Sequence, residues 1–416
     1  EAMRRLKESD LVFDMARFSL RAAMDRLNRS SSSKQGLLSA WTHPLVPLVS
    51  LGPTVDIQHG PYPPSTGFVP RSEVRAFPPG LVLQFATERE TTYGTGRRLL
   101  QTYLEAWEWN RNVGVASVGE LNSVALQEST ARIILTSEAL QEKKIAQLAD
   151  KISDRSPGCR LVCLSGPSSS GKSTVARRLV TQLEVNGLSP VLVSLDDYYQ
   201  DRRDIPKNEQ GEQDFEAPEA LDLPLFHQQL QALVEGEPVH LPRFDFNLGG
   251  RSLDDEPTRV ESEKGVLVLE GLHALNPLIW QPVLGPDSVF RIFVSALTQL
   301  VFDEHNRIQT SKVRLLRRIV RDRRFRSTPT GDTLRRWESV RAGEEAYIFP
   351  FQEECDAMFN SSLPSEAAVL KVFACRYLLE VPKHHECQGE AYQLLKFLEL
   401  FVPIFPDRIP ANSVLR

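Results

Sequence analysis

An eight-residue stretch at 166–173, Gly-Pro-Ser-Ser-Ser-Gly-Lys-Ser, limits what this chain can fold into more than any other feature of its sequence. It matches the pattern GxxxxGK[ST], follows the largely apolar run 160–165, and is followed by apolar residues at helical spacing. Between a strand and a helix, the backbone amides of such a loop face phosphate oxygens, and the lysine adds positive charge. The stretch predicts an ATP-binding loop made by Gly166, Pro167, Ser168, Ser169, Ser170, Gly171, Lys172, Ser173 and Thr174.

The residue types of this loop have separate expected tasks. Lys172 is expected to contact the β- and γ-phosphates, and the hydroxyl of Ser173 is expected to be a ligand of Mg²⁺. The loop by itself leaves open whether the phosphoryl acceptor is water, a protein or a small molecule.

From residue 159 onward, short apolar strands alternate with longer amphipathic helices. Strands are expected at 160–165, 190–195, 265–269 and 289–294, and helices at 172–186 and 222–235. This alternation predicts an α/β fold of the P-loop NTPase type, with a parallel sheet and helices on both faces.

The sequence before residue 154 has a different character. Helical patterns at 1–27 and 137–152 flank Pro- and Gly-rich segments around short apolar stretches such as 81–85. We therefore expect a smaller appended α+β domain at 1–154, a kinase domain at 155–380 and a helical C-terminal tail at 381–416.

Composition excludes several classes of protein. Hydrophobic residues make up 41% of the chain and the net charge is −5, so a folded protein is expected rather than a disordered chain or a general polyanion binder. No apolar run approaches the roughly 20 residues of a membrane-spanning helix. The five cysteines are scattered without zinc-site spacing, which favours a reducing compartment. The cytoplasm is expected first, and an organelle second because a targeting peptide could precede Glu1.

Two acidic positions follow expected strands, where ligands of open parallel sheets collect. Asp196 comes at the end of 190–195, and a carboxylate there can accept the proton of an alcohol that attacks a phosphoryl group. Glu270 ends the strand 265–269, and its position suits a magnesium ligand, direct or through water. For each of them, a helix cap or an ordinary strand-end charge is the alternative.

A cluster of arginines lies at 312–326. As a helix, this segment places Leu315, Leu316 and Ile319 on a core face and several arginines on the other. In a phosphotransferase such arginines neutralise charge on the transferred group. A solvated helix face and an RNA-binding patch are the alternatives.

Taken together in their order, these elements resemble the uridine kinase and phosphoribulokinase family over residues 160–360. After the phosphate loop, 194–199 is similar to the catalytic-aspartate segment of that family, 214–222 to its FDHPDAFD element, and 241–246 to its PxYDF element. Glu270 with Gly271 and the arginine helix follow in the same order.

The resemblance implies roles for individual residues. Asp196 would be the general base, assisted by Lys172, and Mg²⁺ would be surrounded by Ser173, Asp196 and Glu270. Tyr199, Phe215, Glu216 and Phe244 would line the acceptor pocket, with core packing as the alternative for the two phenylalanines. Arg318, Arg321 and Arg326 would belong to a mobile lid over the phosphates.

Some positions depart from the family pattern. The segment Asn247-Leu248-Gly249-Gly250-Arg251 stands where uridine–cytidine kinases typically have a pyrimidine-contacting histidine. Phe244 replaces the tyrosine of the PxYDF element, and Glu216 replaces the sugar-binding aspartate. These departures remove groups that would select the acceptor. Uridine or cytidine is therefore a default taken from the family and not a deduction from these residues.

Three further stretches, 60–67, 347–354 and 409–416, resemble a subgroup in which the kinase follows a region related to the N-terminal part of threonyl-tRNA synthetases. We recognise no synthetase metal motif there, so a regulatory or substrate-sensing module is the expectation.

The sequence leads to an ATP- and Mg²⁺-dependent kinase that phosphorylates the 5′-hydroxyl of a nucleoside, a small-molecule partner. Self-association stays open, and no membrane or nucleic-acid partner is expected. One alternative is the same chemistry on a purine nucleoside, a sugar phosphate or a vitamin precursor. The other is a nucleotide-dependent RNA-binding or regulatory protein, which would bind RNA in a salt-sensitive manner without turnover.

Overall fold

A computed structural model places five strands of this chain in one parallel sheet. It describes residues 1–27, 32–70, 72–78, 80–85, 96–127, 130–207, 211, 213–245, 250–253, 256–260 and 264–416. Their contacts divide them into two units, of which the first comprises residues 1–92, 117–123 and 301–307 and the second comprises the rest. The expected domain boundaries near 154 and 380 stay predictions.

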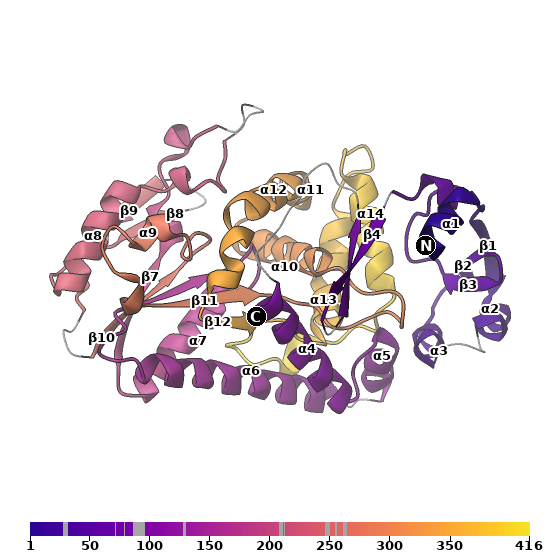
Figure 1. Ribbon diagram of the computed structural model, residues 1–416, viewed down its shortest axis with the longest axis horizontal. Helices are drawn as coiled ribbons and strands as arrows, with labels where there is room; N and C mark the ends of the chain where they lie inside the picture. The colour runs from indigo at the N-terminus through magenta and orange to yellow at the C-terminus, as the bar shows by residue number, and fades with distance from the viewer. Residues whose placement is uncertain are drawn as a thin grey trace. The chain divides into compact units, whose positions relative to one another are not determined.

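The sheet of the second unit has the strand order β12-β11-β6-β10-β7, with every neighbouring pair parallel. Figure 1 shows these strands between two sets of helices, with α6 and α7 on one side. The strands are β6 (Leu161–Ser165), β7 (Ser189–Ser194), β10 (Gly265–Glu270), β11 (Val289–Ser295) and β12 (Ala357–Asn360). Four of them match the strands expected from the sequence, and the α/β fold with helices on both faces is confirmed.

Alternate residues of the central strands belong to two separate hydrophobic clusters. Val162 and Val268 pack with buried residues of α6 and α7, whereas Leu161 and Leu267 pack on the opposite face with residues of α8 and α9. Because successive side chains of a strand point to opposite faces, both faces of this sheet are covered.

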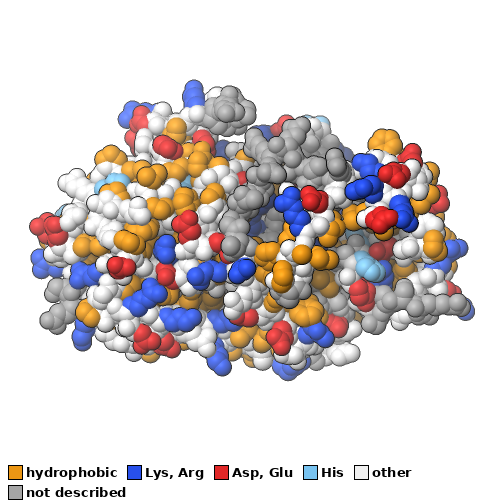
Figure 2. Space-filling model, viewed as in Figure 1, with side chains coloured by type: hydrophobic (Ala, Val, Ile, Leu, Met, Phe, Trp, Pro, Cys, Tyr) orange, Lys and Arg blue, Asp and Glu red, His pale blue; other side chains and the backbone are white. Residues whose placement is uncertain are grey.

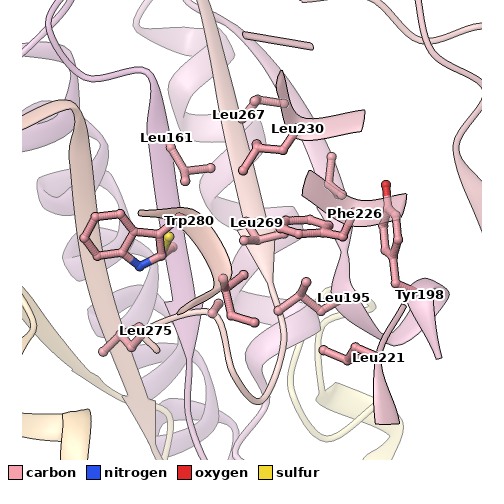
Figure 3. Packing of buried hydrophobic residues seen from close by; sticks show 14 of the residues in the cluster. Leu161, Leu195, Tyr198, Leu221, Phe226, Leu230, Leu267, Leu269, Leu275 and Trp280 are labelled. Carbon is pink, nitrogen blue, oxygen red and sulfur yellow. The ribbon is translucent and has the colours of Figure 1, made fainter. Parts of the chain in front are cut away.

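The second cluster is built around aromatic residues (Figure 3). The rings of Tyr198 and Phe226 meet edge to face, with 5.0 Å between their centroids and an angle of 89° between their planes. Trp280 lies on the other side of the cluster and is fully buried. This packing fixes the segment that follows β7, which carries Asp196.

Local sequence signals explain where the helices begin and end. In α8 (Leu223–Glu235), the side chain of Asp222 accepts a hydrogen bond from the backbone N–H of Leu225, and Gly236 ends the helix in the left-handed conformation. The helices of this unit are α4 (Arg97–Asn112), α6 (Thr130–Ser153), α7 (Lys172–Val185), α8, α9 (Pro277–Trp280), α10 (Thr310–Phe325), α11 (Thr330–Arg335), α12 (Trp337–Tyr347), α13 (Glu366–Leu379) and α14 (Gln388–Glu399), and a hairpin joins β8 (Pro242–Asp245) to β9 (Gly250–Leu253).

The arginine segment forms α10, and Leu315, Leu316 and Ile319 are buried as expected, but the opposite face is not simply exposed to solvent. Arg314 and Arg317 are buried together with Leu315 and Leu316. Their charges are tolerated because Glu344 and Glu366 form ion pairs with them inside the protein.

The first unit contains a three-stranded antiparallel sheet in the order β1-β2-β3 and a separate hairpin. The helix expected over 1–27 is interrupted by β1, because β1 pairs in register with β2 and these long-range hydrogen bonds outweigh the local helical pattern. The elements are α1 (Ala2–Glu8), β1 (Asp14–Ser19), α2 (Leu20–Leu27), α3 (Ser32–Ser39), β2 (Leu45–Leu51), β3 (Thr54–Ile57), β4 (Ser72–Phe77) and β5 (Gly80–Phe85), and α5 (Val118–Leu126) begins here.

Residues 301–307 are held in the first unit by a polar network. Asp303 accepts hydrogen bonds from the backbone of His305 and from the side chain of Asn306, and His59 lies 3.3 Å from it. Asp56 forms an ion pair of 2.9 Å with Lys34. Asp56, Asp303 and His305 offer ligand atoms close enough for a metal ion, but the partners of both carboxylates already satisfy them.

No helix among the described residues is long and apolar enough to cross a membrane.

Candidate active site

The phosphate loop connects β6 to α7 in a conformation that requires glycine at both ends. A Cβ atom on Gly166 would lie 1.9 Å from the carbonyl oxygen of Val294, which no side chain can accommodate. Gly171 has φ +90°, in the left-handed region, and stands directly before the first residue of α7. The backbone of β11 and the start of α7 therefore fix the shape of the loop.

The outer side of the loop is bound by side chains from α10 and α12. The backbone N–H of Ser168 donates to Glu344 Oε1 at 2.9 Å, and Arg314 donates to the carbonyl oxygen of Ser168 at 3.0 Å. Arg318 donates to the Ser168 hydroxyl at 2.7 Å. Three side chains thus hold one residue of the loop.

Lys172 is partly buried and folds back over the loop. Its ammonium group donates to the carbonyl oxygens of Gly166 at 2.8 Å and Pro167 at 3.3 Å. Burial lowers the pKa of Lys172, and the nearby carboxylates of Glu270 and Asp196 oppose this shift. Lys172 is held at the loop and lies in the field of both acidic residues.

Glu270 ends β10 beside the first turn of α7. Its Oε1 accepts hydrogen bonds from Ser173 Oγ and from Ser194 Oγ, each at 3.0 Å. Burial raises the pKa of Glu270, and the charge of Asp196 raises it further. Hard oxygen ligands with excess negative charge suit Mg²⁺, so the donor set of Ser173, Asp196 and Glu270 fits this ion.

Asp196 lies in the short 3₁₀ helix η2 (Leu195–Tyr198), directly after β7. A Cβ atom on Gly271 would lie only 2.5 Å from Leu195 Cβ, so the ends of β7 and β10 lie against each other. Asp196 is half-buried, and its charge acts on Lys172, Glu270, Tyr199 and Glu216. Asp196 is therefore within electrostatic reach of both the phosphate loop and the residues expected to bind the acceptor.

Contacts join the expected acceptor-binding residues to the segment that carries Asp196. Tyr199 donates its hydroxyl to the carbonyl oxygen of Phe215 at 3.0 Å, and its ring centroid is 5.9 Å from that of Phe244. Asp197 accepts the backbone N–H of Phe244 at 3.1 Å. Phe215 and Phe244 are partly buried against the hydrophobic cluster of Figure 3, so they also contribute to packing.

Glu216 is a second buried carboxyl group of this region whose pKa is raised. Burial raises the pKa of Glu216 to about 7, and the charge of Arg318 opposes the shift. A carboxyl group with this pKa changes its charge near neutral pH, which is common where chemistry or ligand binding takes place.

The three expected lid arginines gather at the C-terminal half of α10. The charges of Arg318, Arg321 and Arg326 act on one another and lower the pKa values of Arg318 and Arg326, with burial as the larger cause. Asp322 partly neutralises them, and it forms ion pairs of 3.4 Å with Arg318 and 2.7 Å with Arg321. Repelling arginines beside a phosphate loop favour the binding of an anion.

Sequence analysis gave no role to three residues of this site, Ser194, His273 and Glu344, and Arg314 was expected only as one member of the arginine cluster at 312–326. Ser194 lies two residues before Asp196, and His273 lies three residues after Glu270, so both are close in the chain to acids that the sequence does predict. Glu344 gives no signal in the sequence, because it lies in an ordinary polar helical stretch far from the loop that it binds.

Two further stretches singled out in the sequence, 247–251 and 409–416, remain to be placed in the structure. Of the segment that departs from the family pattern, Asn247, Leu248 and Gly249 lie outside the described residues. The C-terminal stretch 409–416 approaches the site, since a Cβ atom on Gly171 would lie 3.2 Å from Val414 Cγ1.

Comparison with known proteins adds to this geometry. The family model described as "Phosphoribulokinase / Uridine kinase family" matches residues 161–367, which contain all five sheet strands and every site residue named above. A uridine kinase of Deinococcus deserti is 30% identical over 210 residues, which cover 50% of this chain and 91% of that protein. A uridine kinase of Halobacterium salinarum is 29% identical over 212 residues, covering 50% and 82%. A solved structure described as a possible uridine kinase from Bacillus stearothermophilus covers 52% of this chain and 98% of that chain, with 18% identity and a TM-score of 0.35.

Proposed function

Because the chain belongs to the phosphoribulokinase and uridine kinase family and is an ATP-dependent kinase, we propose that it transfers the γ-phosphoryl group of ATP to the 5′-hydroxyl of a nucleoside. The observation that carries this proposal is the position of Asp196. Its charge acts on Lys172 and Glu270 of the phosphate and magnesium site, and also on Tyr199 and Glu216 of the expected acceptor site. A base in this position reaches an alcohol that faces the γ-phosphate.

Asp196 accepts the proton of the attacking hydroxyl as the new phosphorus–oxygen bond forms and the bond to the leaving ADP breaks. Lys172 exchanges its hydrogen bonds with the loop carbonyls for bonds to phosphate oxygens. Its positive charge then stabilises the charge that develops during transfer.

Ser173, Asp196 and Glu270 would hold Mg²⁺, which supplies positive charge to the phosphates and orients them for in-line attack. Arg318, Arg321 and Arg326 neutralise further charge on the transferred group. Their mutual repulsion is relieved when the phosphates bind, so substrate binding and the closing of this region support each other.

The aromatic and acidic residues beyond Asp196 support a nucleoside as acceptor. The ring of Phe244 lies beside that of Tyr199, and the backbone of Phe215 accepts the Tyr199 hydroxyl, so the two phenylalanines can contact the face of a base. The carboxylate of Glu216 can accept hydrogen bonds from the hydroxyls of a ribose. Uridine and cytidine are the first acceptors to test, in keeping with the uridine kinases that the chain resembles.

An RNA-binding role is less well supported by α10. Arg314 and Arg317 are buried and bonded to carboxylates, so they are not presented to a polyanion. On the face shown in Figure 2, basic and acidic side chains of the described residues are interspersed, so they do not gather into a single positive patch there.

The test is ADP formation from Mg·ATP with uridine, cytidine, purine nucleosides, ribulose 5-phosphate and other sugar phosphates. Turnover is expected with one or more nucleosides, and Asp196→Asn is expected to reduce it by about 10²–10⁴-fold while ATP still binds. The control is Asp287→Asn, an exposed carboxylate far from these residues in the chain. Turnover with sugar phosphates alone would change the acceptor, and ATP binding without acceptor-dependent turnover would refute the proposal.

A further inference from the structure

Two buried polar side chains beside the site lack the hydrogen bonds that buried polar groups normally have. Neither ring nitrogen of His273 has a hydrogen-bond partner among the described residues, although only 3% of this residue is exposed. Oε2 of Glu216 also has no hydrogen-bond partner among the described residues, and only 9% of this residue is exposed. An unsatisfied buried polar group costs about 1–3 kcal/mol, so two of them side by side call for a reason.

Both groups lie beneath the same face of α12. A Cβ atom on Gly343 would lie 2.3 Å from Glu216 Cβ. One turn later on the same helix, the ring of Tyr347 meets the ring of His273 edge to face, with 6.2 Å between the centroids. Residues four apart share one side of a helix, so Glu216 and His273 are neighbours under α12.

The pair also lies beside the reacting groups. The charges of Lys172 and Asp196 both act on Glu216, and the charge of Lys172 acts on His273. His273 follows Glu270 by three residues. The residue before it, Leu272, is held in place because its carbonyl oxygen accepts a hydrogen bond from the hydroxyl of Ser165. The pair is therefore at the acceptor side of the site, within the electrostatic reach of the general base.

We propose that His273 and Glu216 together bind two neighbouring hydroxyl groups of the acceptor, so that His273 is a specificity-determining residue for a neutral vicinal diol, such as that of a ribose or another sugar. This inference rests on the proposed kinase function and adds a residue to its acceptor site.

The chemistry of the two groups matches a diol. Burial lowers the pKa of His273 to about 4, and the nearby backbone of Glu216 opposes this shift only in part. The ring is therefore neutral at neutral pH. A neutral imidazole has one donor and one acceptor, as a hydroxyl group has, while a carboxylate only accepts. One acceptor hydroxyl can therefore donate to Glu216, and the neighbouring one can bond to His273. The neutral ring of His273 adds no positive charge for an anionic group, and the nearby charge of Arg318 is already opposed by the carboxylate of Glu216.

The test uses the full chain and compares wild type with His273→Phe, which removes both nitrogens and keeps a ring, and His273→Gln, which keeps a donor and an acceptor. The acceptor KM is expected to rise at least about tenfold in His273→Phe, equivalent to about 1.4 kcal/mol, with a smaller rise in His273→Gln. The KM for ATP is expected to change less than about twofold, because no hydrogen bond joins the ring of His273 to the phosphate loop among the described residues. The matched control is His227→Phe on α8, whose ring bonds to the carbonyl oxygens of Leu278 and Ile279.

Deoxy analogues identify the group that is recognised. Wild type is expected to lose affinity for the 2′-deoxy or the 3′-deoxy nucleoside, whereas His273→Phe is expected to discriminate less between these analogues and the parent compound. An unchanged acceptor KM and unchanged discrimination in a folded His273→Phe enzyme would overturn the inference and leave the kinase function standing.

Calorimetric titration of uridine into the protein loaded with a non-hydrolysable ATP analogue separates the two proposals. If wild type turns over no acceptor, the proposed function fails, and the titration then decides the inference alone. Weaker binding of uridine to His273→Phe than to wild type supports it, and equal binding, or binding to neither protein, overturns it. Should His273→Phe fail to fold, the same comparison is made with His273→Gln, for which an affinity loss larger than that of His227→Phe is required.

Discussion

Arg314 of α10 and Glu344 of α12 form a bidentate ion pair, with two N–O distances of 2.6 Å and at most 1% of either side chain exposed. The same carboxylate accepts the backbone N–H of Ser168, and the same guanidinium donates to the carbonyl oxygen of Ser168. The pair therefore bonds to both backbone groups of one residue in the phosphate loop. It connects two helices from the C-terminal half of the sheet unit to the ATP-binding loop.

Glu344→Gln is expected to destabilise the protein and to weaken ATP binding. Breaking a buried ion pair from one side costs about 3–5 kcal/mol, because the remaining charge stays buried without its partner. Urea unfolding measures the stability, and fluorescence titration with a labelled ATP analogue measures the affinity.

The matched control for this change is Glu345→Gln, at the neighbouring position of α12. Glu345 is 41% exposed and pairs with Arg341 on the surface, so its effect is expected to remain within about 0.5 kcal/mol. Equal effects of the two changes would contradict the role given to Glu344.

Gly166→Ala is expected to weaken ATP binding strongly. The new Cβ would lie 1.9 Å from the backbone oxygen of Val294, so either the loop or β11 must move. We expect the dissociation constant for ATP to rise at least about tenfold, or about 1.4 kcal/mol.

Gly187→Ala separates the clash from backbone strain. Gly187, just beyond the end of α7, has φ +81° but nothing within 4 Å of its added Cβ. This change is expected to cost only the strain, about 1–2 kcal/mol of stability, with ATP affinity retained. A similar loss of ATP affinity in both variants would argue against the clash.

Glu270→Gln is expected to raise the Mg²⁺ concentration at half-maximal activity at least about tenfold, or about 1.4 kcal/mol. The amide keeps the size of the side chain and removes the charge that attracts the ion. Glu235→Gln, an exposed position at the end of α8, is the control. Titration of Mn²⁺ followed by electron paramagnetic resonance gives a second readout without turnover. Unchanged affinity for the ion would exclude Glu270 from the magnesium site.

Glu216→Gln is expected to alter the pH dependence of stability. Burial raises the pKa of Glu216 to about 7 from an ordinary value of 4.5, so between these values the folded protein keeps a proton that the unfolded chain releases. The contribution of this group to stability is present below pH 4.5 and is lost as the pH rises to about 7.

The glutamine variant cannot lose a proton, so relative to wild type it is expected to be more stable at pH 8, by up to about 3 kcal/mol, and equal at pH 4. Thermal unfolding across this range measures the difference, and Glu219→Gln, an exposed position in the same segment, is expected to show none. The acceptor KM of Glu216→Gln is expected to rise, because the amide accepts fewer hydrogen bonds than the carboxylate. A stability difference that does not vary with pH would contradict the raised pKa.

The parts of the site that follow a local rule could be predicted from the sequence. The phosphate loop is recognisable because its glycines, lysine and serine occupy consecutive positions between a strand and a helix. Asp196 and Glu270 could be predicted because the carboxyl ends of parallel strands meet at one edge of a sheet. Four of the five sheet strands were likewise visible as short apolar runs between helices.

Only the tertiary structure determined the contacts that depend on residues far apart in the chain. Glu344 lies 176 positions from Ser168, and nothing near it in the sequence distinguishes it from surface glutamates such as Glu345. The helical pattern of the first residues gave way to β1 because pairing with β2 satisfies the backbone of both strands. The burial of Arg317 against Glu366, and of Glu216 and His273 beneath α12, likewise follows from packing between elements. The sequence by itself determined the local geometry that binds phosphate and places the acids, whereas burial and long-range pairing determined which charges are neutralised and which polar groups are left for a ligand.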